Sequence, residues 1–248
     1  MVCTYNPADE RLTRVLDAIQ AQDLDAQEWE LLVVDNNSSP AVSGRPFFRD
    51  RGIRVEVESI QGLAVARAFG VKHTQGGIIV FVDDDNVINP DYLSTVCRVF
   101  QDSRIGVISG AISPEYEKIP GAWFRNEESR LAIRRPPTEA TYLTNIPIFN
   151  DFFPIGAGMA VRREVISSYF QSIADGSSFI PGRVGSQLSS AEDVDLDFFA
   201  ISQGYLIGTA GSLKSLHIIP AERTSLNYLS RLAIGAVESA GEVNRKWA

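Results

Sequence analysis

Two short apolar stretches, each followed at once by polar side chains, constrain most strongly what this chain can fold into. They run over residues 31–34 and 78–82, and no polar residue interrupts either one. Strands that are apolar on both faces are typical of a parallel sheet that helices cover on each side. The two stretches therefore predict an α/β fold.

The polar clusters that follow these stretches indicate where a ligand binds. Residues 35–37 (Asp-Asn-Asn) follow the first stretch, and the three aspartates at residues 83–85 follow the second. In an open parallel sheet, ligands bind beyond the carboxyl ends of the strands. We therefore expect Asp35 and Asp85 to lie at the same edge of one sheet.

Helical periodicity alternates with apolar stretches through the first half of the chain and returns near its end. Helices are expected over residues 9–22, 64–73, 90–101, 192–202 and 225–243, and further strands over residues 53–57 and 105–108. Residues 111–150 show no sustained period. Since no linker separates two folding units, we predict a single Rossmann-like domain over residues 1–248, with a mostly parallel central sheet flanked by helices.

Composition and charge exclude several classes of protein. The 248 residues are 44% hydrophobic and 22% charged, and they carry a formal net charge of −8. An acidic surface repels phosphate backbones, so we expect no nucleic acid partner. An acidic protein can still bind an anionic nucleotide when a divalent cation supplies positive charge locally.

Cysteine content and hydropathy indicate the cellular compartment in which the protein is expected. Two cysteines, Cys3 and Cys97, are too few for a disulfide framework, and no apolar run reaches the roughly 20 residues that span a bilayer. We expect reduced thiols, a cytoplasmic protein and no transmembrane segment. The amphipathic helix over residues 225–243 leaves contact with the inner face of a membrane open.

The three consecutive carboxylates of Asp83, Asp84 and Asp85 repel one another, so a strand end that carries them indicates a bound cation. The expected chemistry is Mg²⁺ or Mn²⁺ held by one or two of these carboxylates together with diphosphate oxygens. The alternative is a solvated acidic turn without a ligand.

Five short motifs follow one another along the chain. They are Val-Asp-Asn-Asn-Ser at 34–38, Gly-Leu-Ala-Val-Ala-Arg at 62–67, the aspartates at 83–85, Pro-Ile-Gly-Ala-Gly-Met-Ala-Val-Arg-Arg at 154–163 and Ala-Glu-Asp at 191–193. In this order they resemble glycosyltransferase family 2, whose members are inverting enzymes with the GT-A fold. The resemblance extends from Thr4 to about His217.

This resemblance implies an activity and a division of the chain. The activity is transfer of a sugar from a nucleotide-diphosphate donor, a UDP-sugar, to a hydroxyl of a glycan or lipid-linked acceptor, in polysaccharide or glycan assembly. Residues 1–110 would form the nucleotide-sugar-binding half, residues 111–220 the acceptor-binding half and residues 221–248 a C-terminal helix.

The resemblance also implies roles for residues on the donor side. By this resemblance Thr4 and Tyr5 line the base pocket, and Asp35 accepts a hydrogen bond from the base. Asp84 contacts the ribose. Asp85 holds the Mn or Mg ion against the diphosphate.

Arg67 and His217 each have two interpretations. By the resemblance, Arg67 approaches the diphosphate and His217 binds the metal, while Asp83 supports its two acidic neighbours. A helical arginine is more often solvated, and a lone histidine among apolar residues is more often a hydrogen-bonded core residue. The residues themselves leave both interpretations open.

Asp193 is the candidate catalytic base, and Glu192 beside it is assigned to substrate binding. An inverting transfer requires a carboxylate that takes the acceptor's proton, while a metal neutralises the leaving diphosphate. Both residues begin a helix, where acidic side chains also suit the helix dipole, so a structural role stays open. Residues 175–190, rich in Gly and Ser, precede the pair, and we expect them to form a lid.

Two other classes of function fit part of the pattern. An aspartate-nucleophile, Mg-dependent phosphatase would use Asp83 and Asp85, but its signature normally opens the domain, and it leaves Asp35 and Asp193 unexplained. A non-catalytic sugar- or nucleotide-binding module would need neither a metal cluster nor a separate carboxylate. Donor hydrolysis with and without EDTA discriminates between these functions.

Overall fold

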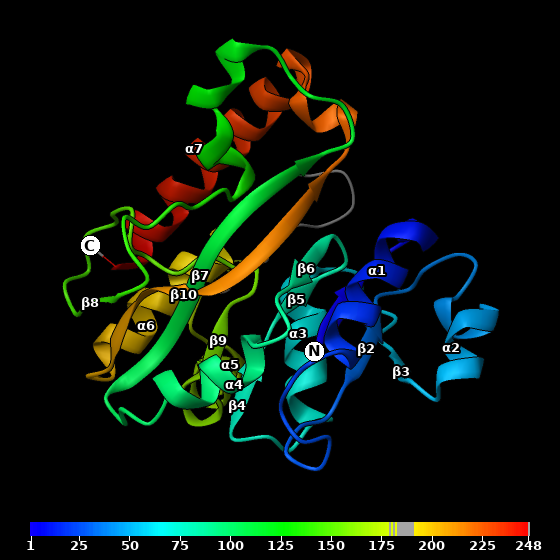
Figure 1. Ribbon diagram of the computed structural model, residues 1–248. Helices are drawn as coiled ribbons and strands as arrows, with labels where there is room; N and C mark the ends of the chain where they lie inside the picture. Colours follow the sequence, from blue (N-terminus) through cyan, green and yellow to red (C-terminus); the bar gives the residue numbers. More distant parts are fainter. Residues whose placement is uncertain (179, 181, 183–190, 248) are drawn as a thin grey trace.

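The computed structural model describes residues 1–178, 180, 182 and 191–247. The segment expected to form a lid, residues 175–190, lies for the most part outside the described residues. Figure 1 shows two sheets, one built from the blue N-terminal part of the chain and the other from the green to orange parts. The cluster of acidic residues lies where the two sheets meet.

The first sheet is entirely parallel and has the strand order β3-β2-β1-β5. Its strands are β1 (Val2–Thr4), β2 (Leu32–Asp35), β3 (Arg54–Val57) and β5 (Val82–Asp83). Thr4 lies opposite Asp35, and Cys3 lies opposite Asp83. The two polar clusters therefore follow strands that end at one edge of this sheet, as predicted.

Helices cover both faces of the first sheet because its central strand is apolar on both sides. The helices of the N-terminal half are α1 (Asp9–Gln20), α2 (Pro46–Arg51), α3 (Leu63–Lys72) and α4 (Tyr92–Val99), of which α3 packs on β1 and β2 and α4 packs on the second sheet. Val33 packs in the same cluster as the buried stripe of α1, whereas Val34 packs with Ala66 of α3. Successive side chains of this strand thus pack against helices on opposite faces of the sheet.

The second sheet is mixed, with the order β4-β9-β7-β10-β6 and with β8 paired to β10. Its strands are β4 (Ile78–Val80), β6 (Asn86–Ile88), β7 (Ile105–Tyr116), β8 (Thr141–Thr144), β9 (Ala160–Arg162) and β10 (Leu206–Ile219). Only β7 and β10 pair in parallel. The expected parallel pairing is therefore found for every pair of strands in the first sheet. In the second sheet it is found for β7 and β10, whereas the other pairs are antiparallel.

The single strand expected over residues 78–82 is two strands in different sheets. β4 pairs with β9 of the second sheet, whereas β5 pairs with β1 of the first. Phe81 lies at the break, where its amide donates to Met159 O at 2.8 Å and the next amide, of Val82, donates to Met1 O at 3.0 Å. The exchange of backbone partners divides the strand.

The second sheet supports the helices of the C-terminal half. These are α5 (Arg163–Ala174), α6 (Glu192–Ser202) and α7 (Leu226–Trp247), with 3₁₀ turns η2 (Ala122–Asn126), η3 (Glu128–Leu131) and η4 (Ala221–Thr224). A further 3₁₀ turn, η1 (Val42–Gly44), lies between β2 and α2 in the N-terminal half. In Figure 1, β7 and β10 run together into an upper lobe that η2, η3 and α7 surround. Ile112, Phe124, Leu131 and Leu232 form the core of this lobe.

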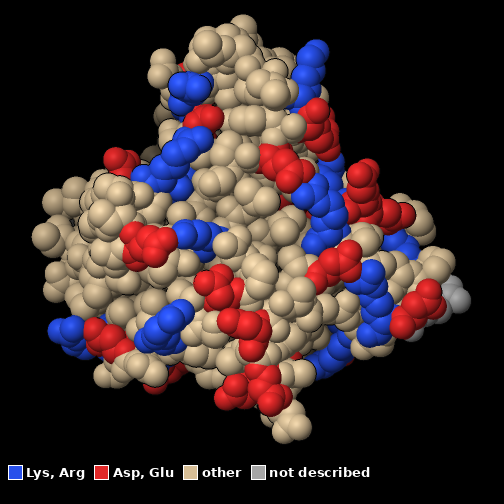
Figure 2. All heavy atoms as spheres, viewed as in Figure 1, with Lys and Arg blue, Asp and Glu red and all other residues tan. Residues whose placement is uncertain are grey.

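The helices expected near residues 9–22, 64–73, 90–101, 192–202 and 225–243 are all present, whereas α2, α5, β8 and most of β10 had no predicted counterpart. Within the described part of the chain, no helix is long and apolar enough to cross a bilayer. Figure 2 shows Lys and Arg interspersed with Asp and Glu over one face of the molecule.

Candidate active site

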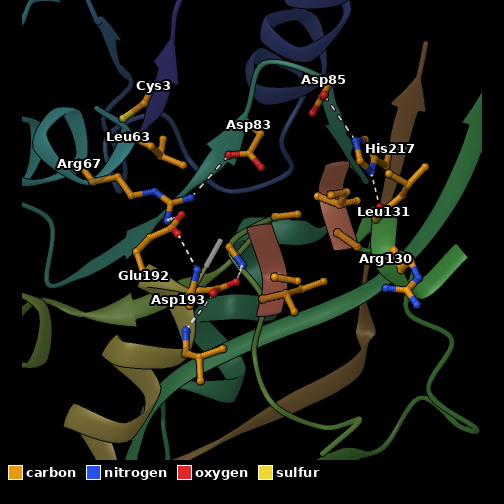
Figure 3. Close-up of a pocket in the computed structure, with 18 of the residues that line it drawn as sticks. Cys3, Leu63, Arg67, Asp83, Asp85, Arg130, Leu131, Glu192, Asp193 and His217 are labelled. Carbon is orange, nitrogen blue, oxygen red and sulfur yellow. Dashed lines mark hydrogen bonds and ion pairs between the residues drawn. The ribbon is translucent and has the colours of Figure 1, made fainter. Parts of the chain in front are cut away.

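A cavity of about 810 Å³ lies at the carboxyl edge of the first sheet and extends along the second half of the chain. Eight of the residues singled out in the sequence line it: Thr4, Tyr5, Arg67, Asp84, Asp85, Glu192, Asp193 and His217. Residues that are about 190 positions apart in the sequence thus face one space (Figure 3).

Asp35 is the one predicted site residue that is not among the described lining residues. Its side chain is fully buried, and its two carboxylate oxygens accept hydrogen bonds from the amides of Ser38 and Val42, each at 2.9 Å. Asn36 lines the cavity instead. Its side-chain oxygen accepts a hydrogen bond from Gly62 N at 2.8 Å, which joins this edge of the sheet to the start of α3.

Two of the aspartates after β5 differ in their partners. Thr4 Oγ1 donates a hydrogen bond to Asp84 Oδ2. Burial, and then the neighbouring charge of Asp85, raise the pKa of Asp84 to about 7. Asp83 lies on the other side of the strand end, with its Oδ1 3.6 Å from Nη2 of Arg67.

Asp85 faces His217 because β10 pairs with β6. Ile218 N donates to Asp85 O at 2.8 Å, which places the preceding histidine beside the carboxylate. His217 Nε2 lies 3.4 Å from Asp85 Oδ2, and His217 Nδ1 lies 2.9 Å from Leu131 O (Figure 3). A carbonyl oxygen only accepts, so Nδ1 carries the proton and the lone pair of a neutral ring faces the carboxylate.

The pair formed by Asp85 and His217 fits a divalent cation. Two electron-rich atoms that face each other in a buried place are unfavourable unless a cation or a proton lies between them, and in this structure the guanidinium of Arg223 lies against both. The hydrogen bond from Nδ1 to a backbone carbonyl is also the usual support of a metal-binding histidine. Among the described residues no group of three or more His, Cys, Asp or Glu side chains is arranged to hold a metal. A metal here would take its remaining ligands from water or from a substrate.

Arg67 is buried, not solvated. Its guanidinium lies between Asp83 and Glu192, at 3.6 Å from a carboxylate oxygen of each, and 4.8 Å from the ring centroid of Phe81 (Figure 3). Burial opposes its charge, but Glu192 and Asp83 outweigh this effect and raise the pKa of Arg67. The alternative of an exposed surface ion pair is therefore wrong.

The carboxylate of Asp193 is held by main-chain donors at the start of α6. Its Oδ2 accepts from Gly156 N at 3.0 Å, and its Oδ1 accepts from Val194 N at 2.9 Å. Gly156 belongs to the motif over residues 154–163, so two motifs of the sequence meet here. The arrangement places an oriented carboxylate in the cavity wall.

The other two aspartates of α6 are not solvated either, since both Asp195 and Asp197 are fully buried. Asp195 accepts hydrogen bonds from Tyr169, Lys246 and Trp247, each at 2.7 Å. Asp195 therefore anchors the last turn of α7 to α6, the helix that carries Asp193 in its first turn.

Several cavity residues were not assigned to the site from the sequence. They are Arg130 and Leu131 of η3, Arg134, Arg223 of η4, and Leu232, Ala236, Ala240 and Val243 of α7. Arg223 is the most important of these, because its Nη1 donates to Asp85 Oδ2 at 2.8 Å. Its position depends on the pairing of β10, which no local pattern predicts.

Comparison with known proteins identifies the family. The sequence profile described as "Glycosyl transferase family 2" matches residues 1–170, so the chain belongs to this family. EpsH of Bacillus subtilis (strain 168) is 28% identical over 111 residues, which are 44% of this chain and 31% of that protein. The chain thus matches about a third of the length of this relative.

Solved structures share the fold. Staphylococcus aureus TarS, residues 1–349, is 18% identical with a TM-score of 0.60, and the similarity covers 100% of this chain and 68% of that one. GalNAc-T7, solved with UDP, GalNAc and Mn²⁺, is 15% identical with a TM-score of 0.62, over 94% of this chain and 46% of that one. The predicted family and the predicted α/β fold class are both confirmed.

Proposed function

We propose that this chain transfers a sugar, with inversion, from a UDP-sugar to a hydroxyl of a glycan or lipid-linked acceptor. The observation that supports this most is one cavity with two separate carboxylate groups, Asp85 beside His217 and Asp193 on α6. Solved relatives support the donor, because TarS has been crystallised with UDP-GlcNAc and GalNAc-T7 with UDP and Mn²⁺. A phosphatase or a binding module has no comparable support.

The donor binds at the carboxyl edge of the first sheet. Thr4 and Tyr5 line the base pocket, and Asp84 receives the ribose, whose hydroxyl groups match a carboxylate that already accepts from Thr4. Asp35 contributes indirectly. Its buried carboxylate accepts hydrogen bonds from the turn after β2 and so fixes the position of Asn36, which lines the pocket. Arg67 stabilises this edge by pairing with Asp83.

Asp85 and His217 hold the divalent cation, Mn²⁺ or Mg²⁺. A cation held there would supply positive charge to the leaving diphosphate. The chain would supply one carboxylate and one imidazole, and the donor would supply the other oxygen ligands. This division suits Mg²⁺ or Mn²⁺, since such ions are usually bound by one or two carboxylates together with the phosphate oxygens of a substrate.

Asp193 takes the acceptor's proton. The acceptor oxygen forms a bond to the anomeric carbon while the bond from that carbon to the diphosphate oxygen breaks. The electron pair of the broken bond leaves with UDP, and the proton of the acceptor hydroxyl passes to Asp193. Main-chain donors at Gly156 and Val194 keep the carboxylate oriented, so that it need not be reorganised in the transition state.

The acceptor side is formed by residues 111–220 and α7. Ala236, Ala240 and Val243 give the cavity an apolar wall, while Leu226 and Val237 of the same helix are 70% and 73% exposed. This amphipathic surface favours a lipid-linked acceptor and contact with the inner face of a membrane, in a cytoplasmic enzyme of polysaccharide or glycan assembly.

Titration calorimetry with UDP, with and without Mn²⁺, tests the donor site. The wild type should bind UDP in the presence of Mn²⁺ and lose most of this binding in EDTA. Asp85→Ala should abolish the Mn²⁺-dependent part, and Glu238→Ala, on the exposed face of α7, should leave it intact. Equal UDP affinity in Asp85→Ala and wild type would refute the metal assignment.

A panel of UDP-sugars tests the activity itself. Slow hydrolysis of at least one UDP-sugar, abolished by EDTA and by Asp85→Ala, is the expected result. Hydrolysis of a phosphate monoester instead, lost on Asp83→Asn, would favour the phosphatase alternative.

A further inference from the structure

Arg223 lies where a cation bound by Asp85 and His217 would lie. Its Nη1 is 2.8 Å from Asp85 Oδ2 and 3.4 Å from His217 Nε2. These are the two atoms to which the proposed function assigns the divalent cation. A guanidinium and a divalent cation cannot share both atoms, because their volumes overlap and their charges repel each other.

The element that carries Arg223 is suited to movement. η4 (Ala221–Thr224) contains no buried residue, and the side chain of Arg223 is 24% exposed. A surface turn without apolar anchors can shift without disturbing the core. Departure of the guanidinium therefore leaves the β10 strand and its histidine in place.

Asp85 and His217 keep their orientation when Arg223 leaves. The second oxygen of Asp85, Oδ1, accepts from Asn86 Nδ2 at 2.6 Å, and His217 Nδ1 remains bonded to Leu131 O. The position of the two candidate ligands is thus fixed by contacts that do not involve Arg223. The guanidinium is the exchangeable member of the group.

Charge balance determines what can replace the guanidinium. A buried carboxylate without a cation is strongly unfavourable, so Asp85 needs a positive partner in each state. A displaced guanidinium likewise needs an anion, and the diphosphate of a donor bound against Asp85 brings one. A cation and a diphosphate that arrive together satisfy both groups.

We propose that Arg223 is an exchangeable counterion: it pairs with Asp85 while the site holds no donor, and it moves to the donor's diphosphate when a divalent cation binds Asp85. The inference rests on the proposed function. It has a regulatory consequence, because the metal alone must compete with Arg223, whereas the metal with a nucleotide diphosphate does not. Each ligand should therefore raise the affinity of the other.

The test measures Mn²⁺ and UDP binding in Arg223→Met and in a control, Arg231→Met, an exposed arginine of α7. Without nucleotide, Arg223→Met should bind Mn²⁺ on the order of tenfold more tightly than wild type, because its competitor is gone. At saturating Mn²⁺ the same variant should bind UDP on the order of tenfold more weakly, since a charge-assisted contact to the diphosphate is lost. Uridine, which has no diphosphate, should bind wild type and Arg223→Met equally.

The two opposite shifts, with Arg231→Met like wild type, would support the exchange. Unchanged Mn²⁺ affinity in Arg223→Met would overturn it, and so would unchanged UDP affinity at saturating Mn²⁺. Arg223→Gln, measured in the same way, decides the matter if the Met variant is poorly folded. A different result, equal Mn²⁺-dependent UDP binding in wild type and Asp85→Ala, would refute the proposed metal site rather than the exchange.

Discussion

The cavity has two charged ends that are built in different ways. At the donor end, Asp85 pairs with Arg223, whose guanidinium comes from a surface turn without buried residues. At the acceptor end, Asp193 is held by the main-chain amides of Gly156 and Val194 at the start of a core helix. A site that admits and releases charged ligands needs exchangeable partners, whereas a base needs a fixed position. The contrast follows from these two tasks.

Asp193→Asn should have the largest effect, because it removes the proton acceptor but keeps the shape of the side chain. Sugar transfer should fall by on the order of 10²-fold or more, the usual size of a lost general base. UDP and Mn²⁺ affinity should stay unchanged, since those ligands bind the other end. Initial rates and calorimetry measure the two effects, with Glu238→Gln as the control. A full transfer rate in Asp193→Asn would show that the base lies elsewhere.

Asp195→Asn should destabilise the contact between α6 and the last turn of α7. The change leaves Lys246, whose side chain is 12% exposed, without its buried partner. We expect a loss of roughly 2 kcal/mol in the free energy of unfolding, less than the roughly 3–5 kcal/mol of a fully broken buried pair, because the amide keeps some hydrogen bonds. Urea denaturation measures it. The double variant Asp195→Asn with Lys246→Met should recover part of the loss, and a midpoint equal to wild type in the single variant would contradict the anchor.

Asp197→Asn should have the smallest effect, and it should depend on pH. Neither oxygen of Asp197 has a hydrogen-bond partner among the described residues, and burial, followed by the charge of Asp193, raises the pKa of this carboxyl well above its usual range. The folded protein then binds a proton that the unfolded chain releases, so this carboxyl lowers stability as pH rises above about 4.

The variant removes that titration. Relative to wild type, Asp197→Asn should therefore become more stable as the pH rises from 5 to 8. Urea denaturation at both pH values measures the difference. An identical pH dependence in the two proteins would mean that Asp197 is not a neutral acid in the folded state.

The donor edge could be predicted from the sequence because its signals are local. Each polar cluster directly follows its own apolar strand, and the register that places Thr4 opposite Asp35 follows from parallel pairing. The split of residues 78–82 could not be predicted, since apolar residues look the same whichever sheet they join. Only the backbone partners of Phe81 and Val82 show the change.

The burial of Arg67 and the position of Arg223 also depend on distant parts of the chain. Glycine at residue 156 leaves room for the Arg67 guanidinium, since a Cβ there would lie 3.0 Å from Arg67 Nη2. Arg223 reaches Asp85 because β10 pairs with β6 and ends beside it. Helical periodicity and composition carry no information on either contact.

The break at Phe81 has a consequence for how this fold can be recombined. Val80 is paired to β9 of the second sheet, and two residues later Val82 is paired to β1 of the first. Phe81 alone therefore joins the strand that pairs with β9 to the strand that ends in the first of the aspartates. A chimera that takes its acceptor half from another family member must also take residues 78–83, because the natural unit of exchange includes this joint.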